Sequence, residues 1–161
     1  IEAARGAALL DVLLIAGIVA AVFLADRVGR IRLQVLGFAG CAVGLAMAAL
    51  QSHVEEPART LLLFGGFMLF NFMTNLGPNA QTYLLAGEVF PTNIRGKGAG
   101  FAAAFAKAGA AITAFVFPLV LVSAGTDWLL IGLVFTSLLG AAVTWWFRIE
   151  TTGVNLEQIG R

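Results

Sequence analysis

The sequence has little charge, one histidine and one cysteine. Lys, Arg, Asp and Glu make up 12% of the 161 residues, whereas a soluble domain carries about 25%. Because Cys41 and His53 stand alone, the sequence predicts neither a disulfide framework nor a Cys/His metal site. The formal net charge of +1 does not indicate nucleic acid as a partner. No nucleophile–base pair occurs at helical spacing, so we expect neither an enzyme nor a bound cofactor.

Apolar residues are abundant instead. They make up 60% of the chain, and the mean hydropathy is +0.92. This composition predicts an all-α integral membrane protein, because a backbone in lipid must satisfy its own hydrogen bonds. Five apolar segments are long enough to span a bilayer as helices. They cover residues 6–25, 33–50, 61–86, 99–122 and 128–147, and a polar tail follows at 148–161.

The polar stretches between the segments indicate an orientation. Residues 26–32, residues 88–97 and the tail carry most of the Lys and Arg. Residues 51–60 are acidic on balance, and residues 123–127 hold no Lys or Arg. The positive-inside rule places the basic stretches in the cytoplasm. We therefore expect a multi-pass protein of the plasma or inner membrane that starts outside, crosses five times and ends in the cytoplasm.

Three asparagines lie within the third apolar segment. Asn71, Asn75 and Asn79 recur every four residues, so they share one face of a helix. Gly77-Pro78 interrupts the same segment and removes a backbone hydrogen bond, which lipid tolerates only where the region packs on protein or lines a cavity. The asparagines therefore either line a site or join helices through hydrogen bonds worth about 0.6 kcal/mol each.

A lysine lies deep in the fourth segment. Lys107 is about nine residues inside the apolar run, which puts it roughly 13 Å from the end of the helix. A cation at such depth costs at least ~2.5–3.5 kcal/mol unless it faces a cavity or a partner. Lys107 thus indicates a binding site, and the alternative is that its side chain snorkels to the interface.

Three motifs occur at the predicted cytoplasmic side. Residues 26–32, Asp-Arg-Val-Gly-Arg-Ile-Arg, resemble the loop signature of the major facilitator superfamily; the alternative is a simple basic anchor. Residues 88–95 resemble the Glu-x-x-Pro-x-x-x-Arg signature of its sugar porters and phosphate:proton symporters. Residues 150–159 are similar to the Glu-Thr-Lys-Gly ending of those families, with Thr152 in place of the usual Lys. The resemblance implies a conformational latch made of Asp26, Arg30, Glu88 and Arg95.

Two further stretches resemble the phosphate:proton symporters in particular. Residues 77–82 are similar to their Gly-Pro-Asn-x-Thr-Thr segment, and residues 106–110 to their Gly-Lys-x-Gly-Ala pattern, with Ala106 in place of Gly. The resemblance implies that Asn79 binds the solute and that Lys107 lies near it. Asn75 and Asn71 are further candidates for the substrate site.

The resemblance also implies an architecture and a function. The five segments resemble helices eight to twelve of a twelve-helix transporter, so one more helix and the N-terminal half of the same protein are expected as partners. The expected activity is proton-coupled symport by alternating access through the lipid bilayer. Inorganic phosphate is the favoured solute, because a buried lysine suits an anion. A sugar or organic-acid symporter and a non-transporting scaffold or receptor are the alternatives.

Overall fold

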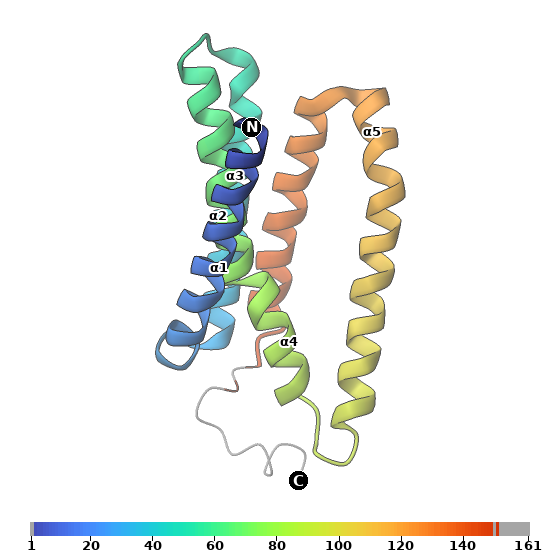
Figure 1. Cartoon of the computed structure of the whole chain (residues 1–161). Helices are drawn as coiled ribbons and strands as arrows, with labels where there is room; N and C mark the ends of the chain where they lie inside the picture. The colour runs from blue at the N-terminus through green and yellow to red at the C-terminus, as the bar shows by residue number, and fades with distance from the viewer. Residues whose placement is uncertain (1, 150, 152–161) are drawn as a thin grey trace.

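The computed structural model describes residues 2–149 and 151, and for residues 2–10 the backbone alone. Over this range the chain is helical and contains no strand. The elements are α1 (Glu2–Val28), α2 (Arg30–Ala49), a 3-10 helix (Leu50–His53), α3 (Ala58–Leu76), α4 (Pro78–Glu88) and α5 (Arg95–Trp146). They run up and down as a bundle (Figure 1). The all-α membrane fold predicted from the sequence is confirmed, with helices that overlap all five apolar segments.

Three stretches of the described chain are long and apolar enough to cross a membrane. They are α2 with the 3-10 helix, α3 with α4, and α5. The 52 residues of α5 would measure about 78 Å if straight, far more than the ~30 Å core of a bilayer. The helix instead folds back on itself (Figure 1). Two predicted segments therefore lie within one element.

Gly125 makes this reversal of α5. Its backbone has φ 84° and ψ 174° inside the helix, a conformation that glycine reaches without the strain of a Cβ. The reversal falls within the predicted loop at residues 123–127. It divides α5 into a first arm, residues 95–124, and a second arm, residues 126–146.

A second break separates α3 from α4, where Gly77-Pro78 predicted one. Gly77 is non-helical, with φ −110° and ψ −92°, and Pro78 is the first residue of α4, a position that does not need its missing N–H. Gly77 also lies against α2, since a Cβ on it would come within 2.6 Å of the Cα of Gly37. The break thus turns α4 away from α3 and holds it against α2.

Small residues bring the helices together. A Cβ on Gly44 of α2 would lie 2.6 Å from the carbonyl oxygen of Gly66 in α3, and one on Gly66 would lie 2.5 Å from that of Gly44. Such backbone contact is typical of helix packing in lipid, where the burial of apolar surface does not drive helices to associate. At Gly96 and Gly100, by contrast, a Cβ would meet no described atom within 4 Å.

The two arms of α5 differ in their surroundings. The second arm packs on α2, where Leu130 joins Leu45 and Ala48 in a buried cluster. The first arm stands apart from α1, α2 and α3 (Figure 1), and residues 104–119 are exposed throughout. Most of the first arm is therefore available to contact polypeptide or lipid that this chain does not supply.

Candidate functional site

A cavity of about 830 Å³ opens between α4 and the first arm of α5. The α4 wall is one helix face, because its residues recur at three- and four-residue spacing. The facing wall consists of alanine and glycine, which leave the space unfilled. The residues that line the cavity include Thr74, Pro78, Asn79, Thr82, Tyr83, Ala103 and Ala106. The cavity is thus an apolar chamber with a few polar groups on its α3–α4 side.

Asn79 is held on this wall by a ladder of asparagines. Its Nδ2 donates to Oδ1 of Asn75 at 2.9 Å, and Nδ2 of Asn75 donates to the carbonyl oxygen of Asn71 at 2.8 Å. Asn75 is 4% exposed. The ladder crosses the break between α3 and α4, so it fixes the rotation of Asn79 where the backbone bonding is interrupted. One bond joins α4 to α3 across the break, and neither bond reaches another helix of the described bundle.

The structure brings only one of the four predicted substrate residues to the cavity. Asn79 lines it, whereas Asn75 and Asn71 are not among the residues that line it. Lys107 is exposed on the first arm, next to the wall residues Ala103 and Ala106, but does not line the cavity itself. The substrate roles of Asn75, Asn71 and Lys107 therefore stay predictions.

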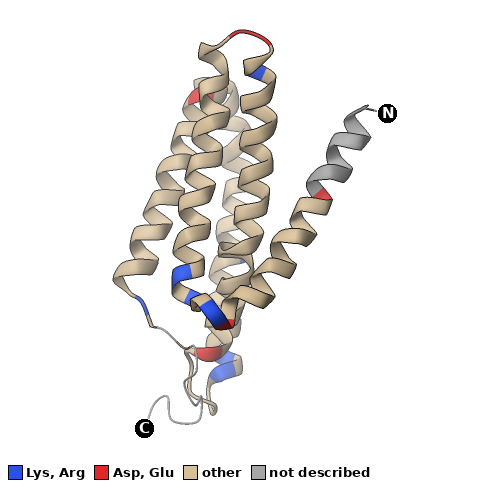
Figure 2. Cartoon of the chain, turned by 90° about the vertical axis from the view of Figure 1, so that its left-hand side faces the viewer, with Lys and Arg blue, Asp and Glu red and all other residues tan. Residues whose placement is uncertain are grey.

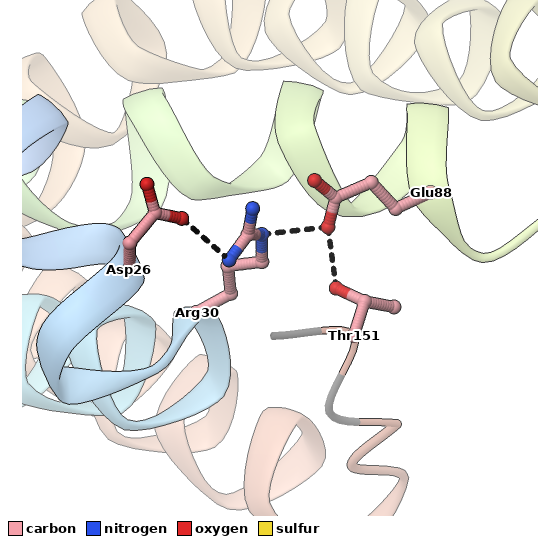
Figure 3. Close-up of polar contacts among 4 residues, drawn as sticks. All are labelled: Asp26, Arg30, Glu88 and Thr151. Atoms are coloured by element: carbon pink, nitrogen blue, oxygen red, sulfur yellow. Dashed lines mark hydrogen bonds and ion pairs between the residues drawn. The ribbon is translucent and has the colours of Figure 1, made fainter. Parts of the chain in front are cut away.

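A charge cluster lies at the end of the bundle where most Lys and Arg gather (Figure 2). Its members are Asp26, Arg30, Glu88 and Thr151, shown in Figure 3. Nε of Arg30 lies 2.6 Å from Oε2 of Glu88, and both side chains are mostly buried, with 13% and 15% exposed. Nη1 of Arg30 lies 3.2 Å from Oδ1 of Asp26, whose side chain is 78% exposed. The buried pair is therefore the stronger link, because water screens the exposed one.

The cluster joins three polar segments that are far apart in the sequence. Gly29, with φ 97°, makes the tight turn that carries Arg30 into α2. Glu88 ends α4, and Thr151 follows α5. Oγ1 of Thr151 donates to Oε2 of Glu88 at 2.5 Å, so this oxygen accepts from two segments at once. The cluster thus brings together residues 26–32, residues 88–97 and the start of the tail at one end of the bundle, as the sequence predicted.

The observed cluster differs from the predicted latch in two residues. The sequence predicts Arg95 as a member of the latch, but its Nε donates to the carbonyl oxygen of Phe90 and its Nη2 to Oγ1 of Thr92, both at 3.3 Å. It therefore closes its own turn. Thr151 was not predicted, although the motif at residues 150–159 includes it; residues 150 and 152–159 of that motif lie outside the described residues.

Comparison with known families gives one match over nearly the whole chain. The family described as "Sugar (and other) transporter" matches residues 4–161. A probable inorganic phosphate transporter 1-12 from Oryza sativa subsp. japonica is 40% identical over 97 residues, which are 60% of this chain and 18% of the relative. A probable inorganic phosphate transporter 1-6 from Arabidopsis thaliana is 34% identical over 136 residues, which are 83% of this chain and 26% of the relative.

Solved structures show the same fold. The proton:xylose symporter XylE, of the major facilitator superfamily, superposes with a TM-score of 0.87 at 21% identity. The match covers 98% of this chain and 34% of XylE. An inward-open structure of XylE from E. coli gives a TM-score of 0.81 at 22% identity, with 93% and 33% covered. The chain thus spans about a third or less of the length of these relatives.

Proposed function

The chain belongs to the sugar (and other) transporter family of the major facilitator superfamily, and we propose that it is part of a proton-coupled symporter for inorganic phosphate. One observation carries the proposal. Asn79 stands, fixed by Asn75, on the wall of a chamber of about 830 Å³ between two apolar helices. A polar group held in such a place marks a solute path, because lipid would penalise it. The relatives at 40% and 34% identity are named phosphate transporters, which supports phosphate over a sugar.

Lys107 has a place in this proposal although it does not line the cavity. It lies on the arm of α5 whose surface is uncovered in this chain. A cation in the middle of a membrane helix needs a polar environment, and transporter sites form between repeats near the midplane. We propose that its ammonium group faces the N-terminal half of the transporter and provides the positive charge for the anion.

The charge cluster fits the cytoplasmic latch that alternating access needs. In this arrangement its end of the bundle is cytoplasmic and the start of the chain lies outside, as the basic residues indicate. In the observed arrangement of this side, Glu88 binds Arg30 and Thr151. Opening of the transporter would separate these groups, and the opposite side would close around the emptied site.

Replacement of Lys107 tests the proposed function. The full-length transporter in proteoliposomes is expected to accumulate labelled phosphate under an inward proton gradient. Lys107→Ala should abolish this uptake, because the anion loses its charged partner. Lys97→Ala is the matched control, since Lys97 is an exposed cation in the first turn of α5, and it should transport normally.

Each other outcome of this assay favours an alternative. Uptake of xylose or an organic acid without phosphate would indicate another symporter of the same family. Absence of any solute flux, with Lys107→Ala tolerated, would indicate a scaffold or receptor. Wild-type phosphate uptake by Lys107→Ala would remove Lys107 from the site.

A further inference from the structure

The polar side chains that line the cavity are not equally free to bind a solute. Oγ1 of Thr74 lies 3.2 Å from Sγ of Cys41, within hydrogen-bond distance. Oγ1 of Thr82 donates to the carbonyl oxygen of Pro78 at 2.5 Å. Both threonine hydroxyls are therefore occupied by neighbours in the protein, and neither is the first choice as a solute ligand.

Tyr83 is different. It is the single tyrosine of the sequence, it lines the same cavity, and it is 58% exposed. Its hydroxyl has no hydrogen-bond partner within residues 11–149. Tyr83 follows Asn79 by four residues, so it lies on the same face of α4, about 6 Å further along the helix.

Asn79 presents the complementary group. One N–H of its Nδ2 donates to Oδ1 of Asn75, and its acceptor Oδ1 has no partner in the described part of the chain. The wall thus offers the Oδ1 and the second N–H of Asn79 and, a helical turn further on, one phenolic hydroxyl. An amide oxygen can only accept, whereas a phenol can donate.

We propose that Tyr83 is a specificity-determining residue of the solute site, whose hydroxyl donates to an oxygen of the bound oxyanion. Oδ1 of Asn79 accepts from a protonated oxygen of the same solute, which selects an anion that still carries a proton, as dihydrogen phosphate does. A hydrogen bond to a charged acceptor is stronger than one between neutral groups. This assignment rests on the proposed phosphate transport.

The test is Tyr83→Phe in the full-length transporter, which removes the hydroxyl and keeps the ring. We expect the KM for phosphate to rise about tenfold, the effect of losing one hydrogen bond to a charged group, and the maximal rate to stay within about twofold. Thr136→Val is the matched control. It removes a hydroxyl on the second arm of α5 that donates to the carbonyl oxygen of Leu133 and does not line the cavity, so its KM should equal that of the wild type.

Two results would contradict different parts of the proposal. Unchanged KM in Tyr83→Phe, with wild-type phosphate uptake intact, would overturn the role of Tyr83 and leave the transporter assignment in place. A wild-type protein that carries no phosphate would overturn the proposed function, and this assignment with it. Competition by sulfate, which carries no proton at neutral pH, gives a second measurement: inhibition of uptake by sulfate as strong as by unlabelled phosphate would contradict the selection of a protonated anion.

Discussion

Glu88→Gln is expected to lower the maximal transport rate at least tenfold and to leave the KM for phosphate nearly unchanged. The substitution keeps the size of the side chain but removes the charge that Arg30 faces at 2.6 Å. Removing one partner of a buried ion pair costs about 3–5 kcal/mol, and about 1.4 kcal/mol corresponds to a tenfold change in an equilibrium. The latched state therefore becomes rarely populated, while the residues that line the cavity are unchanged.

Asp26→Asn is the matched control for this experiment. It removes the other carboxylate bound to Arg30, but that carboxylate is 78% exposed, and such pairs contribute at most about 1 kcal/mol. Its rate should fall only a few-fold. A charge swap, Arg30→Glu with Glu88→Arg, should recover part of the rate lost in Glu88→Gln. Equal losses in Asp26→Asn and Glu88→Gln, or a KM that rises as steeply as the rate falls, would argue against a latch.

Asn79→Asp is expected to reduce phosphate affinity by at least a hundredfold. A carboxylate on the cavity wall would repel the anion by about 4 kcal/mol at 4 Å and an effective dielectric constant of 20. The substitution preserves the shape of the side chain, so the cavity should keep its volume. A neutral sugar would not meet this repulsion.

Asn79→Ala separates charge from hydrogen bonding. Both variants lose the bond from Asn79 to Asn75, but only Asn79→Asp adds a charge. If the solute is an anion, initial uptake rates at pH 7 over a range of phosphate concentrations will give a much higher KM for Asn79→Asp than for Asn79→Ala. Equal KM values in the two variants would indicate a neutral solute.

The features set by local sequence could be predicted. Long apolar runs predicted the helices. Gly77-Pro78 predicted the break, because proline and glycine determine the backbone conformation at their own positions. The meeting of residues 26–32 with Glu88 followed from the side of the membrane to which each turn was assigned. The four-residue spacing of the asparagines predicted that they share one helix face. It did not predict that a hydrogen bond between them crosses the break between α3 and α4.

The features set by packing could not be predicted. Which acid Arg30 binds depends on how α4 lies against α2, and the motif at residues 88–95 placed Arg95 near Glu88 equally well. Thr151 joins the cluster only because the chain after α5 returns to α4. The position of Lys107 relative to the cavity depends on the rotation of a helix that is largely uncovered here, and no sequence period determines that rotation.

Protection of introduced cysteines by phosphate tests most directly whether the cavity holds the solute. Ala103 lines the cavity, whereas its neighbour Ala104 is exposed and does not; the native Cys41 is buried. In the full-length transporter, with other accessible cysteines replaced, phosphate should slow the reaction of Ala103→Cys with a water-soluble thiol reagent and leave that of Ala104→Cys unchanged. Equal reaction rates at Ala103→Cys with and without saturating phosphate would contradict the assignment of this cavity as the solute site.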